Sequence, residues 1–179
     1  MKLDKFIQTY DSVLTAEQCK NLIEIFERNK DSQESHNTNF YKFNQLNLNT
    51  TPGCEILAEN FCRSLVKIYE DYFNKLNLRR YIDIAGFEHV RIKKYMKNSS
   101  DEFKTHVDIT DKESSVRYCI AIAYLNSNNG YTIFPHLNKK IEPLVGRVVV
   151  FPPNWMFPHN GKTPTDSNKY IMMTSLHYS

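Results

Sequence analysis

The stretch FKTHVDIT, residues 103–110, alternates apolar and polar side chains and places a histidine and an aspartate two positions apart. In an extended strand, successive side chains point to opposite faces of the sheet. The pattern therefore predicts a strand with Phe103 on one face and with His106 and Asp108 together on the other. Such a pair is found on solvated strand edges, and it also supplies two ligands of the 2-His-1-carboxylate sites that hold non-haem iron. A second histidine elsewhere in the chain is needed to decide between these interpretations.

The same period of two runs through the second half of the chain. Turn-forming segments separate the apolar runs, and no helix-length pattern lies between them. Strands that follow one another without intervening helices pair antiparallel, as a sandwich or a barrel. We therefore expect a mainly β core over residues 86–179. The six strand-like runs are 88–96, 103–109, 115–126, 131–134, 146–151 and 169–178.

The first 85 residues are predicted to be mainly helical. The sequence TAEQ at 15–18 has the form of a capping box, and apolar residues follow it at helical spacing. Thr51-Pro52 suits the start of a second helix, whose apolar stripe runs from Cys54 to Tyr72. Two helices flanking a β core give an α+β fold class.

Between these helices, residues 29–50 are polar and rich in asparagine. Tyr41 and Phe43 alternate there, which indicates at most a short strand. We interpret the segment as a surface loop or as a mobile lid near a site. The chain is then one domain, 1–179, in which residues 1–85 give helical support and contain the segment that is either a loop or a lid.

Composition excludes several classes of protein. A chain of 179 residues with 41% hydrophobic content is large enough to bury a core. The net charge of +3 comes without any long block of lysine and arginine, so we expect no nucleic-acid partner. No apolar run is long enough to span a membrane. The N-terminus shows no secretory signal, and the four cysteines form no CxxC pair, so we expect free thiols and a cytoplasmic location.

The run VVVFPPNWMFPHNGKTPTDSNKY, residues 148–170, contains the second histidine. His159 lies after the end of an apolar strand, and Lys169 opens the last strand on the same face as Ile171. A lysine on the apolar face of a strand is costly unless an anion occupies the interior. The second half therefore supplies a His-x-Asp pair, a distant histidine and an inward cation, which together indicate a metal site with an anionic co-ligand.

With these residues the chain resembles the 2-oxoglutarate- and Fe(II)-dependent dioxygenases, specifically the prolyl-4-hydroxylase-like branch. The resemblance rests on His106-Val107-Asp108, His159 and Lys169, on YLN (124–126) leading to GYTIFP (130–135), and on the N-terminal SVLTAEQCKNLI. It implies a double-stranded β-helix, a jelly-roll or cupin-like core packed by N-terminal helices, with the metal at one mouth. One departure is NGYT at 129–132, where relatives usually read GGET.

The resemblance also implies a role for particular residues. His106, Asp108 and His159 would bind Fe(II), and Lys169 would pair with the distal carboxylate of 2-oxoglutarate. Further candidates are those that line the cosubstrate pocket, Tyr95, Tyr124 and, more weakly, Thr132, and two weak substrate contacts, Arg91 and Trp155.

The implied activity is hydroxylation of an unactivated C–H bond, with O2 and 2-oxoglutarate consumed, succinate and CO2 released, and ascorbate as a supporting reductant. A prolyl residue of a peptide or protein is the leading substrate. Two alternatives stay open: a hydroxylase of a free amino acid or another small molecule, and a non-catalytic cupin-like binder of a small ligand. The complete triad and Lys169 favour the enzyme.

Overall fold

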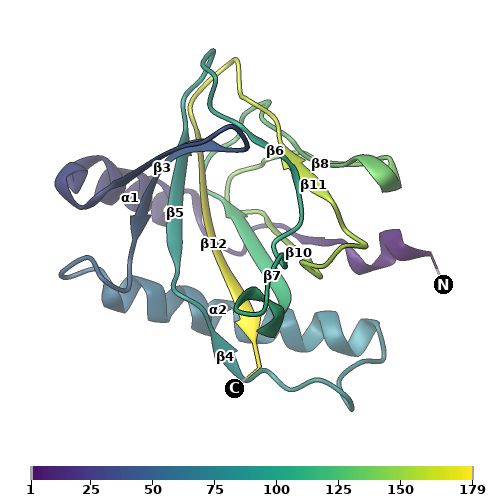
Figure 1. Cartoon of the computed structure of the whole chain (residues 1–179). Helices are drawn as coiled ribbons and strands as arrows, with labels where there is room; N and C mark the ends of the chain where they lie inside the picture. The colour runs from purple at the N-terminus through teal and green to yellow at the C-terminus, as the bar shows by residue number, and fades with distance from the viewer. Residues whose placement is uncertain (1, 179) are drawn as a thin grey trace.

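The computed structural model describes residues 2–178, which form two facing antiparallel sheets covered on one side by helices (Figure 1). The larger sheet contains β1 (Gln8–Tyr10), β2 (Glu34–Asn37), β3 (Lys42–Asn47), β4 (Gly86–Phe87), β5 (Arg91–Tyr95), β7 (Arg117–Tyr124), β10 (Val148–Phe151) and β12 (Lys169–His177). Its order is β1-β10-β7-β12-β5-β3-β2, and β4 pairs with β12. The smaller sheet contains β6 (Phe103–His106), β8 (Thr132–Phe134), β9 (Lys139–Ile141) and β11 (His159–Gly161), in the order β6-β11-β8-β9. This is the mainly β double-stranded β-helix that was expected.

The helices pack on the outer face of the larger sheet. They are α1 (Ala16–Arg28) and α2 (Glu55–Lys75). The chain also forms four short 3-10 turns elsewhere, η1 (Leu3–Phe6), η2 (Lys30–Ser32), η3 (Ser114–Val116) and η4 (Pro135–Leu137). No helix within residues 2–178 is both long and apolar enough to cross a membrane.

The central strand β7 shows how the sequence builds two cores. Its alternate side chains belong to different clusters because neighbouring residues point to opposite faces. Cys119, Ala121 and Ala123 pack with the helices, whereas Ile120, Ile122 and Tyr124 face the space between the sheets. Both faces are buried, which explains the near-continuous apolar run in this part of the sequence.

Helix α1 begins as the sequence predicted. The backbone N–H of Gln18 donates to Oγ1 of Thr15 at 3.1 Å, and the backbone N–H of Thr15 donates to Oε1 of Gln18 at 2.8 Å. Helix α2 begins three residues later than the Thr51-Pro52 signal indicated. Gly53 has a φ of +80°, which a right-handed helix does not allow, so residues 51–53 form a turn before the helix.

The interpretation of residues 29–50 as a surface loop was wrong for much of the segment, while the lid stays a prediction. Residues 34–47 form the β2–β3 hairpin, and β3 pairs with β5 inside the larger sheet. Phe43 and Leu46 of β3 are buried. The polar residues misled the prediction because they alternate with these apolar ones and bond across the hairpin, as Gln45 does to Glu34 at 3.1 Å.

Candidate metal and cosubstrate site

Pairing of β6 with β11 brings the two predicted histidines together. His106 and His159 are directly opposite partners in the ladder. Asp108 follows just beyond the end of β6, where the backbone N–H groups of Asp108 and Ile109 donate to the carbonyl oxygen of Pro153 at 3.0 and 3.2 Å. The loop after β10 therefore anchors the aspartate beside both histidines.

A bulge in β6 changes the direction of one side chain. His106 pairs with His159, but Phe103, three residues earlier, pairs with Gly161, only two residues later. The extra residue in β6 is a β-bulge, and it shifts the alternation of faces. The Phe103 ring consequently stacks on the His106 ring, with centroids 3.4 Å apart and an interplanar angle of 7°. The prediction that Phe103 lies on the opposite face was wrong.

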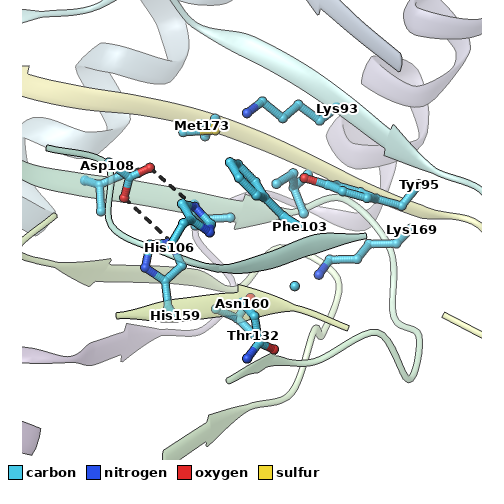
Figure 2. A pocket seen from close by; sticks show the side chains of 14 residues that line it. Lys93, Tyr95, Phe103, His106, Asp108, Thr132, His159, Asn160, Lys169 and Met173 are labelled. Atoms are coloured by element: carbon cyan, nitrogen blue, oxygen red, sulfur yellow. Dashed lines mark ion pairs between the residues drawn. The ribbon is translucent and has the colours of Figure 1, made fainter. Parts of the chain in front are cut away.

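The geometry of the triad suits a metal ion. Nε2 of His106 lies 3.8 Å from Oδ1 of Asp108, and Nε2 of His159 lies 3.6 Å from Oδ2 (Figure 2). One ligand atom from each of the three residues lies within 4.8 Å of the others. Oδ2 of Asp108 is buried without a hydrogen-bond partner, which is costly unless a cation occupies the site. A histidine pair with one carboxylate is the ligand set of non-haem Fe(II) sites.

Backbone carbonyls fix the orientation of both imidazole rings. Nδ1 of His106 lies 2.7 Å from the carbonyl oxygen of Lys104, and Nδ1 of His159 lies 3.2 Å from that of Phe157. A carbonyl only accepts, so each Nδ1 carries the proton and each Nε2 presents a lone pair toward Asp108. Burial, with the nearby His159 imidazole, lowers the pKa of His106 to about 4, so the ring stays in the neutral form that binds metals.

Lys169 faces the same pocket as the triad. It is 3% exposed, and its ammonium lies 5.5 Å from the centroid of the Tyr95 ring and 5.9 Å from that of Tyr124. Burial alone lowers the pKa of Lys169 to about 7, and no carboxylate within residues 2–178 pairs with it. This arrangement suits an anionic ligand. The pocket, with about 410 Å³ of space free of protein atoms, is lined among others by Tyr95, Thr132, Ile120, Ile122, Ile171 and Met173.

Two of the proposed cosubstrate residues bond to each other. The Tyr124 hydroxyl donates to Oγ1 of Thr132 at 2.7 Å, so the tyrosine lies behind the pocket wall that the threonine forms. Gly130 packs against the Lys169 side chain: a Cβ there would lie 3.1 Å from Cδ of Lys169 and 2.9 Å from the carbonyl oxygen of Lys162. This crowding explains why position 130 is a glycine both in NGYT and in the GGET of relatives.

Asn129 occupies the position where relatives usually carry another glycine. Its side-chain N–H donates to Oγ1 of Thr165 at 2.6 Å, and its side-chain oxygen accepts from the Thr165 backbone N–H at 2.8 Å. The departure from GGET thus links the loop before β8 to the loop before β12.

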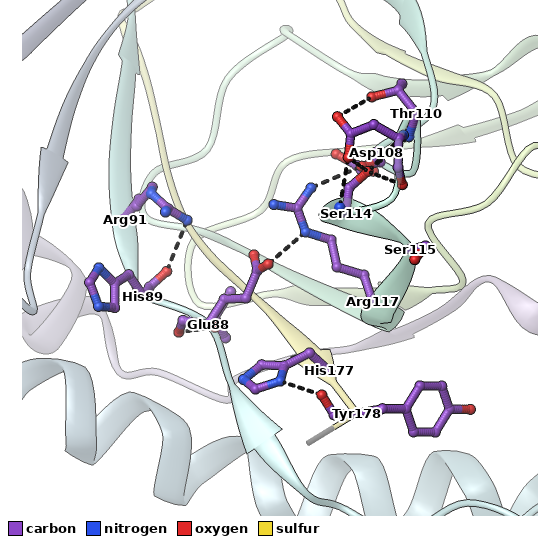
Figure 3. Close-up of polar contacts among 12 residues, drawn as sticks. Glu88, His89, Arg91, Asp108, Thr110, Ser114, Ser115, Arg117, His177 and Tyr178 are labelled. Atoms are coloured by element: carbon purple, nitrogen blue, oxygen red, sulfur yellow. Dashed lines mark hydrogen bonds and ion pairs between the residues drawn. The ribbon is translucent and has the colours of Figure 1, made fainter.

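The two weak substrate candidates do not line the pocket. Arg91 donates to the carbonyl oxygen of His89 at 3.3 Å (Figure 3), and Trp155 is 77% exposed in the loop after β10. Sequence reasoning missed Lys93, which does line the pocket. The period of two that places Tyr95 on the inner face of β5 also places Lys93 there, so the signal was present in the sequence.

Arg117 is a second residue that the sequence did not single out. Its Nη1 donates to the carbonyl oxygen of Asp108 at 2.9 Å, and its Nε pairs with Oε1 of Glu88 at 2.7 Å. Figure 3 shows the guanidinium between the two acceptors. Arg117 therefore holds the backbone of a candidate metal ligand through its carbonyl group.

Comparison with known proteins gives one family and a consistent fold. The model of the 2OG-Fe(II) oxygenase superfamily matches residues 90–177, which contain the triad and Lys169. No curated protein sequence matches the chain.

Solved prolyl hydroxylases share the fold at low sequence identity. The viral collagen prolyl hydroxylase of Paramecium Bursaria Chlorella virus-1, as its 2OG complex, is 19% identical with a TM-score of 0.73, covering 97% of each chain. A Pseudomonas putida prolyl-4-hydroxylase is 14% identical with a TM-score of 0.72, over 99% of this chain and 97% of the other. A Trichoplax adhaerens prolyl hydroxylase, in complex with a hypoxia inducible factor peptide fragment, is 14% identical with a TM-score of 0.71, over 97% and 84%.

Proposed function

Because the chain belongs to the 2OG-Fe(II) oxygenase superfamily, we propose that it hydroxylates an unactivated C–H bond of a prolyl residue in a peptide or protein. The reaction consumes O2 and 2-oxoglutarate and releases succinate and CO2. The observation that carries the proposal is the juxtaposition of the triad with the buried, unpaired ammonium of Lys169 in one pocket.

The triad residues His106, Asp108 and His159 would hold the iron through the two Nε2 atoms and the carboxylate. When bound, Fe(II) with 2-oxoglutarate and O2 supplies the oxidising chemistry that protein side chains lack. The chain contributes ligand orientation: carbonyl acceptors fix both imidazoles, and Arg117 with the Pro153 carbonyl fixes the backbone at Asp108. Such outer contacts raise ligand basicity and hold the ligands in place.

Lys169 would bind the distal carboxylate of 2-oxoglutarate by a charge-assisted hydrogen bond. Tyr95 is its partner in the ladder between β12 and β5 and lines the same end of the pocket. The side chains of Ile120, Ile122 and Ile171 form apolar walls that exclude water from the reacting groups.

A prolyl substrate is supported by the fold that the chain shares with collagen, bacterial and hypoxia-factor prolyl hydroxylases. We also propose a reducing, cytoplasmic location, which is supported by four cysteines that remain free thiols.

The test combines turnover with product mass. Proline-containing peptides and free amino acids are incubated with the protein, Fe(II), 2-oxoglutarate and O2, and succinate and the substrate mass are measured. We expect succinate and a gain of one oxygen atom in a prolyl peptide. Asp108→Ala should abolish both, whereas His136→Ala, at an exposed histidine outside the pocket, should not. Binding of 2-oxoglutarate without turnover of any compound would favour a non-catalytic binder.

A further inference from the structure

Lys93 is a second lysine inside the pocket, and the proposed cosubstrate leaves it unexplained. It lies on the inner face of β5, is directly opposite Ile171 of β12, and is 8% exposed. It lines the pocket together with Asp108 and Met173. In Figure 2 its side chain extends beside Met173, and Phe103 lies between it and Lys169.

The fold provides no anionic partner in contact with the Lys93 ammonium. Within residues 2–178 no hydrogen bond or ion pair joins it to the protein. Its Nζ lies 4.4 Å from the ring centroid of Phe43 and 5.6 Å from that of Phe103. Cation–π contacts offset only part of the cost of removing an ammonium from water. Burial lowers the pKa of Lys93 to about 8, although the more distant Asp108 carboxylate opposes this shift.

The neighbouring lysine shows that the fold can satisfy such a charge. Lys94 points to the other face of β5, and its ammonium pairs with Oε1 of Glu27 at 2.7 Å. The Tyr170 hydroxyl donates to the same carboxylate oxygen at 2.7 Å. The outer face of β5 thus supplies a carboxylate partner for its lysine, whereas the pocket face supplies none for Lys93.

A count of the charges in the pocket shows one positive charge without a negative partner. Lys93 and Lys169 contribute two positive charges to the lining and Asp108 one negative charge, so the lining carries +1 when the histidines are neutral. Fe(II) adds two positive charges, and the 2-oxoglutarate dianion adds two negative ones, so the loaded site also carries +1. Lys169 would pair with the distal carboxylate of the cosubstrate, and the excess charge then belongs to Lys93.

We propose that Lys93 binds a carboxylate of the primary substrate and thereby selects substrates that carry one close to the hydroxylated carbon. This inference rests on the C–H hydroxylation in the proposed function: an acidic peptide would narrow the proposed prolyl substrate, and a free amino acid would replace it. The carboxylate has two sources with the same chemistry: the α-carboxylate of a free amino acid, or an acidic side chain next to the target residue in a peptide. Met173 and Ile122 supply the apolar surface beside it for the carbon that reacts.

The test compares matched carboxylates and carboxamides. The protein is loaded with Mn(II) and 2-oxoglutarate without O2, and binding is measured by thermal shift and titration. One arm pairs L-proline with L-prolinamide, and the other pairs a peptide that has glutamate beside proline with its glutamine counterpart. We expect wild type to bind the carboxylate member of at least one pair about tenfold more tightly, which is equal to about 1.4 kcal/mol. The arm that shows the preference identifies the source.

Lys93→Met should abolish the preference, while Lys97→Met, an exposed lysine beyond the same strand, should retain it. Affinity for 2-oxoglutarate tests the alternative that Lys93 binds the cosubstrate and not the substrate. This affinity should change little in Lys93→Met. A loss of about tenfold or more would show that Lys93 binds the cosubstrate instead and would overturn the proposal. The proposal is also overturned if wild type binds no carboxylate-bearing member, or if Lys93→Met discriminates as well as wild type does. Failure of wild type to bind 2-oxoglutarate at all would instead overturn the proposed function.

Discussion

At the scale of single residues, the proposal that His106, Asp108 and His159 bind a metal is supported by polar atoms that these side chains leave without a partner. His106 and His159 use one nitrogen on a backbone carbonyl and leave the other free, and Asp108 has a buried oxygen without a partner. One buried carboxylate oxygen without a partner thus lies beside two imidazole nitrogens that make no hydrogen bond to residues 2–178. Such groups are rare in folded proteins and indicate an ion or another bound group when they converge.

We predict that His106→Ala or Asp108→Ala abolishes turnover and weakens Fe(II) binding by at least about tenfold, because each change removes a direct ligand. Far-UV circular dichroism should stay near that of wild type, since His106 ends the edge strand β6 and Asp108 lies in the loop just after it. Anaerobic titration with Fe(II) or Mn(II) measures the affinity. Wild-type affinity in either variant would contradict the metal assignment.

Lys169 gives a second prediction at this scale. Lys169→Met should keep iron but lose affinity for 2-oxoglutarate, because a hydrogen bond to a charged group contributes roughly 1.5–3 kcal/mol. The carboxylate left without a partner adds a penalty of about 3–5 kcal/mol when it is buried. The dissociation constant should therefore rise by at least about tenfold.

The control for this prediction is Lys169→Arg, which keeps the charge but changes its geometry, so its effect should be milder. Titration of 2-oxoglutarate into the Mn(II)-loaded proteins compares the three. An unchanged constant in Lys169→Met would show that this ammonium does not bind the cosubstrate.

At the scale of elements, the backbone around Asp108 depends on a contact from the start of β7. Arg117 donates to the Asp108 carbonyl and pairs with Glu88. We predict that Arg117→Met weakens Fe(II) binding about tenfold, at the lower end of the range for residues that orient metal ligands, while affinity for 2-oxoglutarate at the Lys169 end changes less. A purely structural defect would lower both affinities together.

Arg63→Met is the matched control for Arg117→Met, because Arg63 forms an exposed pair with Glu59 on α2. Exposed ion pairs contribute little, so this variant should bind iron as wild type does. Metal titration and urea unfolding of the three proteins separate orientation of the ligand from loss of stability.

Elements were predictable from sequence where local pattern and burial agree. The long strands β7 and β12 and the start of α1 follow from apolar runs and from a capping box. The short strand β11, His159–Gly161, has no such pattern, because its conformation comes from pairing with β6 and β8. The β6 bulge that turns Phe103 toward His106 likewise depends on a partner strand distant in sequence. The His106 and Asp108 pair was predictable because its spacing is local, whereas His159 was identified only together with Lys169 and the family resemblance.

At the scale of the whole molecule, the site lowers the stability of the ligand-free protein. Two buried lysines face one pocket, and burial lowers the pKa of Lys93 to about 8 and that of Lys169 to about 7. In the unfolded chain both groups titrate near their ordinary pKa, so the unfolded state binds more protons between these values and about 10.5. Each lysine thus makes a contribution to stability that improves as pH rises through this window.

This linkage predicts how Lys169→Met changes stability without ligands. Below about pH 7 the wild-type lysine stays charged and buried at full cost, so the methionine variant should be more stable, by an amount on the order of a few kcal/mol. As pH rises toward the unfolded pKa of about 10.5, the wild-type lysine loses its proton in both states, and the advantage of the variant should shrink.

Urea unfolding of both proteins just below pH 7 and about two pH units higher measures this difference, and other titrating groups cancel because the two chains share them. Saturating Mn(II) and 2-oxoglutarate should reverse the order, because the ligands stabilise the wild type in proportion to its tighter binding. A constant difference across pH, or a variant less stable than wild type below pH 7, would show that the Lys169 ammonium is already satisfied in the ligand-free protein. In that case Lys169 would not be a buried charge that only the cosubstrate neutralises.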